Sequence, residues 1–462
     1  MTERFSHRTL VLIGGDFAVI YAALLLALYL RIGLDGSMSL LAENSGWSKI
    51  TLVTLICLVS LYLYDLYDYL VLNNRRELKM RLVQALGTAW IILAVLFYIL
   101  PAWEIGRGTA AYAIIISLFW LLALRSAIHF ILGHPDIGER ILFVGEGAVA
   151  IDSATAALRR RDAGYRIAGF VSDEFEQVAK TLGGARNLGN FSDLEEIVKR
   201  EKIDSIVISA REQRGTFPVD ALLRLRFAGN VSIEESAAFF ERVTGRIHLG
   251  MVRPSWLIFS PKTPDTRFTI VSRQALYRTL AMIGMIVTAP IAILTVILIK
   301  LESAGPCLYR QERVGKNGRT FELIKFRSMR VDAEEDGRPV WAAPDDDRVT
   351  VVGRIIRKIR VDEIPQFWNI LKGEMSFIGP RPERPHFVSQ LAKEIPYYEY
   401  RHLVAPGLTG WAQIKYPYGS SVDDARRKLE YDLYYIKNQS LALDVIILLE
   451  TVKTILFGRG GR

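Results

Sequence analysis

Long apolar stretches separated by short polar segments dominate the first part of the chain. Four of them cover residues 9–30, 50–64, 82–100 and 109–124. A helix that crosses a lipid bilayer needs about 20 mostly apolar residues, or fewer where aromatic or basic side chains lie at its ends. The first and third stretches meet this length, and tyrosines or Arg125 border the other two. We therefore predict that residues 1–134 form a bundle of four transmembrane helices.

The distribution of lysine and arginine between the predicted helices indicates how the bundle is oriented. Basic residues gather before the first helix, in the second loop and after the fourth helix: Arg4, Arg8, Arg75, Arg76, Lys79, Arg81 and Arg140. The other two loops are poorer in both residue types. Because basic loops stay on the cytoplasmic side, we expect both ends of the bundle to face the cytoplasm.

One carboxylate, Asp16, interrupts the first apolar stretch. A charged side chain inside a membrane helix is energetically costly and often has a function. The alternative is that Asp16 faces the interior of the bundle and is hydrogen-bonded there.

Short apolar strands alternate with helical segments after the bundle. The segment "ERILFVGEGAVA" places Gly145, Gly147 and Ala150 between a strand and a helix in a G-x-G-x-x-A pattern. Further strands are predicted in "YRIAGFVSDE" and "DSIVISA". This alternation predicts a Rossmann-like α/β domain over residues 135–265. The glycines can bind a nucleotide at the helix N-terminus, or they can serve only the tight turn.

A fifth apolar segment, residues 280–299, has the length and composition of a transmembrane helix. Pro290 lies in its middle, where proline removes a backbone hydrogen bond and kinks the helix. Basic residues flank the segment at both ends. The positive-inside rule therefore assigns neither end to the outer side of the membrane. We predict a kinked, re-entrant helix over residues 276–300 that enters and leaves by the same membrane face. The alternative, a plain fifth span, would place the rest of the chain outside the cell.

The C-terminal part begins with a basic segment, "QERVGKNGRTFELIKFRSMR". Asn317 and Gly318 predict a turn that joins two strands. The cations of these strands can meet phosphates of a ligand, or they can form a basic surface that faces the membrane. Three consecutive acids follow at residues 345–347. Their setting is typical of a turn, and metal binding is the alternative.

Two adjacent carboxylates, Asp362 and Glu363, follow a group of basic residues that includes Arg357. Pro365 is tolerated only in the first turn of a helix, so we expect the helix of "QFWNILKG" to begin near Asp362. Because helix N-termini stabilise anions, we expect both carboxylates to stay ionised. The pair can cap the helix, or it can act on phosphate as a nucleophile and as a ligand of Mg²⁺.

Two loops rich in proline and glycine follow the carboxylate pair. In "GPRPERP", Pro380 and Pro382 hold Arg381 in an extended conformation, which presents its guanidinium to a phosphate or to the edge of a base. The second loop, "APGLTGWAQIKYPYGSS", carries Trp411 and Gln413, which suit base stacking or closure over a substrate. The C-terminal segment "LALDVIILLETVKTILFGRGGR" is too interrupted to span a membrane but suits a helix at the membrane interface.

Composition supports a membrane protein with an anionic ligand. The 462 residues are 50% hydrophobic and carry a formal net charge of +9. Such a charge favours partners such as phospholipid headgroups, nucleotides or nucleic acid. Cys57 and Cys307 lie far apart in sequence and provide neither a disulfide framework nor a zinc-binding pattern. We read no removable signal peptide at the N-terminus, which lacks a small-residue cleavage site.

Three segments of the chain resemble a family of bacterial sugar transferases that start exopolysaccharide or O-antigen synthesis. The segments are "YRQERVGKNGRTFELIKFRSM", "RVDEIPQFWNILKGEMSFIGPRPERP" and "PGLTGWAQI", and the resemblance covers residues 273–462. These enzymes are polyisoprenyl-phosphate hexose-1-phosphate transferases of the monotopic phosphoglycosyl transferase superfamily. The resemblance implies an α-rich catalytic domain over residues 266–462. The four-helix bundle and the α/β domain in front of it resemble those of the large family members.

The resemblance also implies an activity. A UDP-sugar, expected to be UDP-glucose or UDP-galactose, would donate hexose 1-phosphate to undecaprenyl phosphate and release UMP. Asp362 would form an aspartyl-phosphosugar, Glu363 would bind Mg²⁺, and Lys325, Arg357 and Arg381 would hold phosphates. The enzyme would lie in the bacterial inner (cytoplasmic) membrane with its catalytic domain on the cytoplasmic face. It would bind no nucleic acid, and a homodimer is left open.

The chain departs from the family pattern at three points. The family breaks its re-entrant helix at a Ser-Pro pair, where this chain has Ala289 and Pro290. An arginine often precedes the Pro-Gly of the last loop. Here that residue is Ala405, and Arg401 is the candidate to replace it as a substrate ligand. The sequence "KYPYGSS" stands where the family usually has Asn, Gly and Arg, so the sugar specificity is open.

Two other functions are alternatives to this one. A membrane-anchored nucleotide sensor or scaffold would use the α/β domain and leave the C-terminal part catalytically inert. The intact carboxylate pair and loops argue against it. A nucleotide-sugar dehydratase or epimerase needs a Tyr-x-x-x-Lys pair after the glycine-rich turn, and residues 140–265 lack a clear one.

Overall fold

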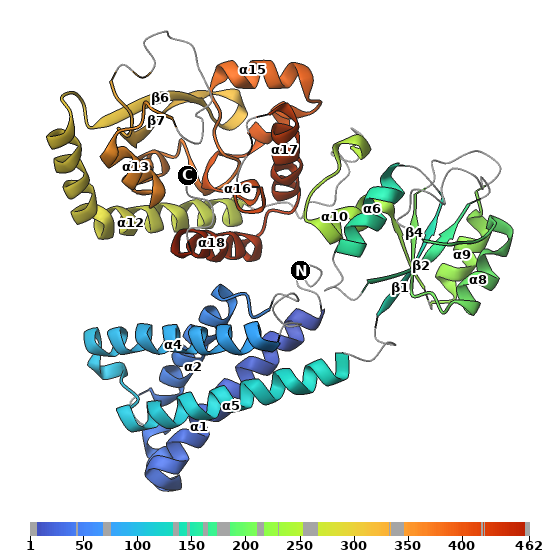
Figure 1. Cartoon of the computed structure of the whole chain (residues 1–462), viewed down its shortest axis with the longest axis horizontal. Helices are drawn as coiled ribbons and strands as arrows, with labels where there is room; N and C mark the ends of the chain where they lie inside the picture. The colour runs from blue at the N-terminus through green and yellow to red at the C-terminus, as the bar shows by residue number, and fades with distance from the viewer. Residues whose placement is uncertain are drawn as a thin grey trace. The chain divides into compact units, whose positions relative to one another are not determined.

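The computed structural model describes most of the chain (Figure 1). The described residues are 7–42, 45–67, 75–132, 138–145, 148–159, 165–172, 185–209, 217–229, 231–252, 267–331, 333, 346–416, 419 and 421–457. Residues 1–243 and residues 244–462 form two compact units. The domain boundaries predicted at residues 134 and 265 lie outside the described residues and stay predictions.

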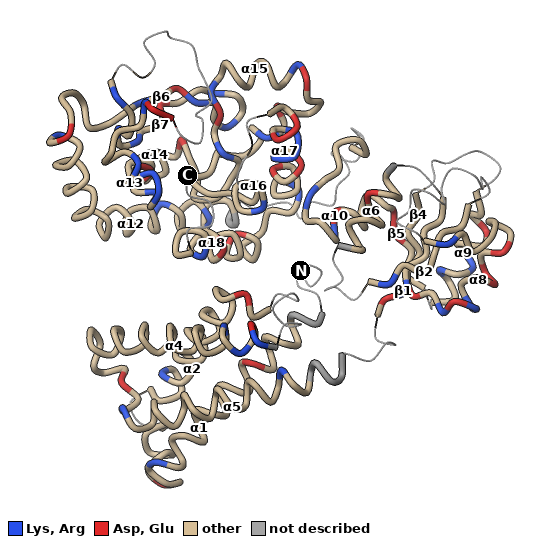
Figure 2. Tube along the Cα trace, in the orientation of Figure 1, with Lys and Arg blue, Asp and Glu red and all other residues tan. Residues whose placement is uncertain are grey.

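The first four long helices are apolar, as predicted. They are α1 (His7–Ala42), α2 (Gly46–Leu63), α4 (Arg75–Ile99) and α5 (Arg107–Leu132). Each is long and apolar enough to cross a membrane, and Figure 2 shows few charged residues along them. α1 packs against α2 and α5, and α2 packs against α4. Ile50, Leu61 and Leu82 lie in the interior of the bundle, whereas Ile91 and Phe119 are exposed, as expected of side chains that face lipid.

Asp16 lies inside the bundle and is fully buried. Its Oδ2 atom accepts a hydrogen bond from Nη2 of Arg125 at 2.6 Å, which joins α1 to α5. The guanidinium of Arg125 also lies over the ring of Tyr67, 5.6 Å from the ring centroid. Charges inside a membrane bundle commonly pair in this way. The interpretation of Asp16 as a hydrogen-bonded residue facing the bundle interior is confirmed.

The α/β domain contains a five-stranded parallel sheet. Its elements are β1 (Glu139–Val144), α6 (Ala148–Arg159), β2 (Tyr165–Val171), β3 (Asn187–Gly189), η3 (Phe191–Asp193), α8 (Leu194–Arg200), β4 (Ser205–Ile208), α9 (Val219–Phe227), β5 (Ser232–Glu235) and α10 (Ser236–Thr244). The strand order is β3-β2-β1-β4-β5, and every pair is parallel. In β1, Phe143 packs in one apolar cluster and Val144 in another, because successive side chains point to opposite faces of a sheet. The Rossmann-like α/β prediction is confirmed.

The glycine-rich turn between β1 and α6 is partly described. Gly145 has a φ of 90°, a conformation that favours glycine. Gly147 lies outside the described residues. Nucleotide binding at this turn therefore stays a prediction.

The C-terminal unit is mostly helical. Its elements are η4 (Leu249–Met251), α12 (Arg267–Glu302), β6 (Leu308–Val314), η5 (Lys316–Gly318), β7 (Thr320–Phe326), α13 (Val351–Lys358), η6 (Val361–Glu363), α14 (Gln366–Lys372), β8 (Ser376–Ile378), α15 (Pro385–Glu394), η7 (Tyr398–Leu403), β9 (Gly407–Thr409), α16 (Trp411–Lys415), α17 (Val422–Lys437) and α18 (Leu441–Leu456). β6 and β7 pair in antiparallel fashion, and Asn317 and Gly318 between them have positive φ angles of 55° and 75°. The predicted strand pair and its turn are confirmed.

The segment that follows α10 packs with the C-terminal unit. The backbone N–H of Ile247 donates to the carbonyl of Glu430 at 3.1 Å, and Nη1 of Arg246 pairs with the Glu430 carboxylate at 2.8 Å. Nε1 of Trp411 donates to the carbonyl of Gly245 at 2.7 Å. These bonds tie residues 245–247 to α17 and to the loop "PGLTGW".

The long apolar helix α12 bends within its length. Figure 1 shows two arms of α12 that run in different directions. Pro290 lies inside this helix, and proline is a common cause of sharp helix bends. Both arms pack on the same unit: Ala281 lies in an apolar cluster with Ile370, and Ile299 lies in another with Ile356. The predicted kink is present.

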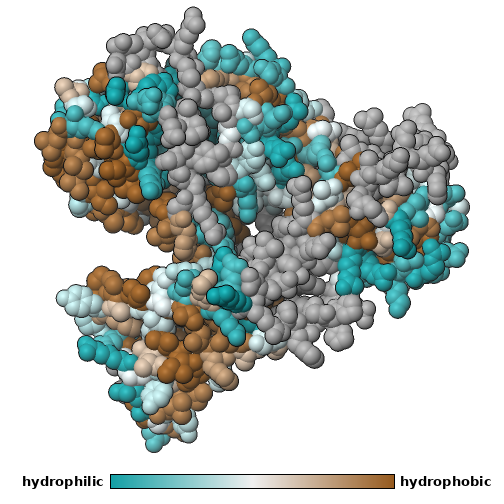
Figure 3. Space-filling model, viewed as in Figure 1, coloured by the Kyte–Doolittle hydropathy of each residue, from teal (hydrophilic) through white to brown (hydrophobic). Residues whose placement is uncertain are grey.

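The outer side of α12 exposes large apolar side chains. They include Ile286, Val287, Ile293, Leu294, Leu298 and Leu301. Figure 3 shows hydrophobic side chains gathered over this helix. α18 also exposes apolar side chains, among them Leu441, Val445, Val452 and Leu456. Apolar surfaces of this kind mark contact with a membrane or another protein.

Candidate active site

Asp362 and Glu363 lie in a single turn of 3-10 helix, η6, between α13 and α14. Arg360, just before this turn, has a positive φ of 61°. α14 begins at Gln366, four residues after the start expected near Asp362. The sequence places the helix start too early because it gives no sign of this extra turn.

Asn369 fastens this region to the neighbouring β-hairpin. It is fully buried. It accepts a hydrogen bond from the backbone N–H of Ile324 at 3.2 Å and donates one to the carbonyl of Glu322 at 2.7 Å. These bonds hold α14 against β7, where Lys325 follows Ile324. The packing of α14 on β7 thus brings Lys325 to the carboxylate pair.

Glu363 is surrounded by three cations. Its Oε1 atom lies 3.0 Å from Nη2 of Arg381 and 3.5 Å from Nζ of Lys325. Its Oε2 atom lies 3.6 Å from Nη1 of Arg360. Burial raises the pKa of Glu363, but the cations Arg381, Lys325 and Arg360 outweigh burial and lower this pKa to about 2. Glu363 therefore stays ionised at neutral pH, as predicted.

Asp362 has a different environment from its neighbour. It is buried, with 8% of its surface exposed, and within the described part of the chain no ion pair holds its carboxylate. Burial raises the pKa of Asp362, while the cation of Lys325 acts in the opposite direction. The two neighbouring carboxylates therefore differ in environment: the pKa of Asp362 is raised, whereas the pKa of Glu363 is lowered. A poorly solvated carboxylate without a direct partner is a stronger nucleophile than one held in an ion pair.

Lys325 and Arg357 contribute positive charge next to the pair. Lys325 is partly buried, which lowers its pKa, while Glu363 raises it. Arg357 lies in the last turn of α13, and its charge lowers the pKa of Asp362. The two cations named from the sequence thus act electrostatically on the carboxylates. Figure 2 shows Lys and Arg gathered along α13.

The loop "GPRPERP" is held in place by main-chain hydrogen bonds to the last glycine-rich loop. The N–H of Gly379 donates to Thr409 and the N–H of Gly407 donates to Pro380, both at 2.9 Å. Pro380 and Pro382 flank Arg381, which removes two main-chain N–H groups from the loop. The guanidinium of Arg381 is thereby presented to Glu363.

Arg401 supports this loop from within the fold. It is buried. Its Nη2 atom donates to the carbonyl of Arg381 at 3.0 Å and lies 2.9 Å from the carboxylate of Asp432, while Nη1 donates to the hydroxyl of Tyr398 at 2.7 Å. Both Nη atoms are thus engaged inside the protein. This geometry favours a role in positioning Arg381 over direct contact with phosphate.

The carboxylates fit Mg²⁺ only together with a substrate. Within the described residues, no three His, Cys, Asp or Glu side chains form a cluster that could hold a metal. Mg²⁺ commonly takes one or two carboxylates and completes its shell with phosphates and water. Oε2 of Glu363 has its ion-pair contact at the longer distance of 3.6 Å, so it keeps a lone pair for such a cation. In the acidic triplet, Asp346 instead accepts hydrogen bonds from Arg348, as in a turn.

Two residues that support the site escaped the sequence interpretation. Asn369 holds the carboxylate turn to the hairpin, and Asp432 pairs with Arg401. Nothing in the sequence separates Asp432 from the other charged residues of α17. Asn369 follows Asp362 by seven residues, about two helical turns. This spacing is the one sequence signal that could have indicated that Asn369 supports the turn that carries the carboxylates.

Two family models match parts of this chain. A family model described as bacterial sugar transferase matches residues 269–458, and a model described as CoA-binding domain matches residues 62–213. The first match contains the carboxylate pair, Lys325, Arg381 and Arg401.

Curated relatives include three sugar transferases. The UDP-N-acetylgalactosamine-undecaprenyl-phosphate N-acetylgalactosaminephosphotransferase of Aeromonas hydrophila is 41% identical over 56% of this chain and 61% of its own length. The undecaprenyl-phosphate glucose phosphotransferase of Komagataeibacter xylinus is 33% identical over 70% of this chain and 60% of its own length. The uncharacterized sugar transferase EpsL of Bacillus subtilis (strain 168) is 37% identical over 37% of this chain and 81% of its own length.

The match to the first two of these relatives spans about three fifths of their length, 61% and 60%. The match to the third spans most of it. Together with the family model, these similarities show that the chain belongs to the bacterial sugar transferase family.

Proposed function

We propose that this protein transfers a sugar 1-phosphate from a UDP-sugar to undecaprenyl phosphate and releases UMP. The observation that carries this proposal is the arrangement of Asp362 and Glu363 among Lys325, Arg360 and Arg381. Asp362, for which the described residues provide no ion pair, lies beside Glu363, which anchors the cations. Such a site suits nucleophilic attack on a phosphorus atom whose oxygens the cations hold. The names of the relatives support these substrates.

The reaction would proceed in two displacements at phosphorus. In the first, a carboxylate oxygen of Asp362 attacks the phosphorus that bears the sugar, and the bond from this phosphorus to UMP breaks. UMP leaves, and Asp362 carries the phosphosugar as an acyl phosphate. In the second displacement, a phosphate oxygen of undecaprenyl phosphate attacks the same phosphorus. The bond to Asp362 breaks, and undecaprenyl-diphosphate-sugar is formed.

The cations around Glu363 would hold the diphosphate during both displacements. Arg381 has a planar guanidinium that can donate two parallel hydrogen bonds to a phosphate. Lys325, in strand β7 of the hairpin, provides the second cation, and its Nζ atom lies 3.5 Å from Glu363. Before substrate binds, the Glu363 carboxylate keeps these like charges close together. When the diphosphate arrives, its oxygens can take over as their partners.

A divalent cation fits this proposal as part of the enzyme–substrate complex. Glu363, with its low pKa, is the residue that would bind Mg²⁺. Bound there, the metal would neutralise charge on the diphosphate and favour departure of UMP.

The site would face the cytoplasmic surface of the bacterial inner membrane. The exposed apolar side chains of α12 and α18 lie on the unit that carries the carboxylates. An enzyme whose acceptor is a membrane lipid needs its site at the bilayer surface. We propose that the bent helix α12 enters the membrane and returns to the same side. Its two arms, which both pack on the catalytic unit, support this arrangement.

The re-entrant arrangement predicts the side on which the hairpin lies. A cysteine placed at exposed Lys316, in the turn between β6 and β7, should react with a membrane-impermeant maleimide only after cells are permeabilised. Ser48→Cys, at the start of α2 and on the predicted outer side, is the matched control and should react in intact cells. Labelling of Lys316→Cys in intact cells would instead support the plain fifth span.

The transfer itself is tested by following UMP. Purified full-length protein with undecaprenyl phosphate, Mg²⁺ and a UDP-sugar should release UMP in equal amount to the undecaprenyl-diphosphate-sugar formed. Omission of undecaprenyl phosphate should reduce release to one UMP per enzyme, and EDTA should stop turnover. The scaffold alternative predicts no UMP with any UDP-sugar, together with nucleotide binding by the α/β domain. The scaffold alternative does not explain why Asp362 and Glu363 lie together among several cations, because a purely structural domain does not need such a site.

A further inference from the structure

Residues 245–252 form a strap on the catalytic unit, although the family match begins only at residue 269. Ile247 and Leu249 of the strap are buried and lie in the same apolar cluster as Trp411. The backbone N–H of Leu249 donates to Oε1 of Glu430 at 3.4 Å, and Glu430 also bonds two other groups of the strap. The strap is therefore an integral part of the catalytic unit, and the mechanism proposed for the transfer does not use it.

Trp411 joins the strap to the last glycine-rich loop. Its Nε1 atom donates to the carbonyl of Gly245 at 2.7 Å, and its ring stacks on Tyr434 of α17, with the ring centroids 6.0 Å apart. Only 9% of the surface of Trp411 is exposed. The indole is thus packed inside the protein, which argues against the role in base stacking that the sequence allowed.

A shift of Trp411 has a direct route to the Pro-Arg-Pro loop. Just before Trp411, the carbonyl of Thr409 accepts the N–H of Gly379 at 2.9 Å. The main chains of the two loops lie so close together that a Cβ atom on Gly410 would collide with the carbonyl oxygen of Gly379. Close-packed protein transmits a displacement rather than absorbing it. Movement of Trp411 should therefore move Gly379 and, two residues further along, Arg381.

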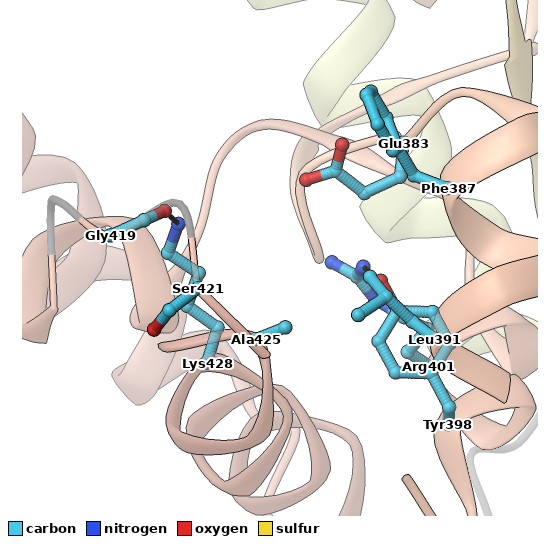
Figure 4. A pocket seen from close by; sticks show the side chains of 9 residues that line it. All are labelled: Glu383, Phe387, Leu391, Tyr398, Arg401, Gly419, Ser421, Ala425 and Lys428. Atoms are coloured by element: carbon cyan, nitrogen blue, oxygen red, sulfur yellow. Dashed lines mark hydrogen bonds between the residues drawn. The ribbon is translucent and has the colours of Figure 1, made fainter. Parts of the chain in front are cut away.

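A cavity of about 40 Å³ separates the Pro-Arg-Pro loop from part of α17. Figure 4 shows Glu383 and Arg401 on one side of it and Lys428 of α17 on the other. Side chains that face each other across a cavity lack direct packing contacts. On this side, the loop therefore depends on individual links. One is the hydrogen bond from Arg401 to the carbonyl of Arg381, and the other runs through Trp411 to the strap.

We infer that the strap positions Arg381 for the reaction, and that Trp411 and Gly245 are positioning residues. The inference rests on the proposed function, because Arg381 is one of the groups that would hold the diphosphate of the donor. A group that binds a reacting phosphate has to be held within about 0.5 Å of its productive place. The hydrogen bond between Trp411 and Gly245 supplies this constraint from a segment that precedes the family match.

Two substitutions perturb this contact from its two ends. Trp411→Phe keeps an aromatic ring but removes the N–H donor. Gly245→Ala adds a Cβ atom that would lie 3.2 Å from the ring of Trp411. UMP release by the full-length protein is measured with undecaprenyl phosphate, Mg²⁺ and UDP-glucose, UDP-galactose or UDP-N-acetylgalactosamine. With the best of these donors, we expect each substitution to lower kcat/KM about tenfold, since a misplacement of about 1 Å can cost about 10²-fold.

Each of these variants has a matched control. Gly229 has a positive φ of 76°, close to the 66° of Gly245, but a Cβ atom there would have no neighbour within 4 Å. Gly229→Ala therefore adds similar backbone strain without touching a side chain and should keep wild-type activity. Trp47→Phe removes an indole N–H at an exposed position of α2 and should also leave activity unchanged.

A double-mutant cycle with Arg381→Ala distinguishes positioning from a general structural role. If the strap acts through Arg381, Trp411→Phe should change the residual kcat/KM of Arg381→Ala by about twofold or less. A loss of about tenfold in both backgrounds would overturn the inference. Wild-type activity in both Trp411→Phe and Gly245→Ala would overturn it as well, and either result would leave the proposed function intact. If the wild-type protein releases no UMP with any of the three donors, the proposed function fails, and the inference fails with it.

Discussion

Asp362→Asn should abolish release of UMP, with a loss of about 10⁴-fold or more in kcat. The amide has nearly the same shape as the carboxylate but cannot form the acyl phosphate. Asp362 has no ion pair within the described residues, so the substitution breaks no salt bridge and should leave the fold intact. Asp347→Asn, at an exposed position that the mechanism does not use, is the matched control and should keep wild-type activity.

The pH dependence of the wild-type enzyme follows from the same residue. Attack requires the carboxylate form of Asp362, whose pKa burial raises above its usual range. The rate should therefore fall as the pH is lowered through this raised pKa, while Glu363, with its pKa of about 2, stays ionised. Full turnover of Asp362→Asn, or a rate that rises on acidification, would rule out Asp362 as the nucleophile.

Glu363→Gln should reduce kcat about 10²- to 10³-fold and raise the concentration of Mg²⁺ needed for half-maximal activity. The substitution removes the negative charge that holds Arg381 and Lys325 at 3.0 and 3.5 Å. These cations then repel each other and lose their common position. The loss should be smaller than for Asp362→Asn because the nucleophile itself remains.

A titration of activity against Mg²⁺ measures this effect. Glu394→Gln, at an exposed position near the end of α15, controls for the loss of one carboxylate and should leave both kcat and the Mg²⁺ requirement unchanged. If Glu363→Gln lowered kcat without changing the Mg²⁺ requirement, Glu363 would position the cations but would not bind the metal.

The long elements of this fold could be predicted from the sequence because each has a strong periodic or compositional signal. The apolar lengths of α1, α2, α4 and α5 predict helices, and Asn317-Gly318 predicts the hairpin turn. Pro290 inside the uncharged segment 280–299 predicts the bend of α12. The short strands β3 and β5 were not predicted because Asn187–Gly189 and Ser232–Glu235 contain few apolar residues. Such strands form only through pairing with their neighbours in the sheet.

The candidate site could be predicted in its chemistry but not in its packing. The sequence singles out Asp362, Glu363 and Arg381 because two acids and a proline-locked arginine are unusual near so many cations. The sequence does not predict that Arg401 points inward and pairs with Asp432, because this contact forms only when η7 and α17 pack together in the fold. The sequence also could not predict that the pKa values of Asp362 and Glu363 shift in opposite directions, because burial and ion pairs arise only in the folded chain.

The role of Asp362 as a covalent nucleophile is tested most directly by trapping the intermediate. The full-length enzyme is incubated with Mg²⁺ and a UDP-sugar in the absence of undecaprenyl phosphate, and the peptide that contains Asp362 is examined by mass spectrometry. We expect this peptide to gain the mass of one sugar phosphate, to lose it when undecaprenyl phosphate is added, and to remain unmodified in Asp362→Asn. A phosphosugar found on another residue, or an unmodified peptide from an enzyme that turns over at full rate, would contradict the account.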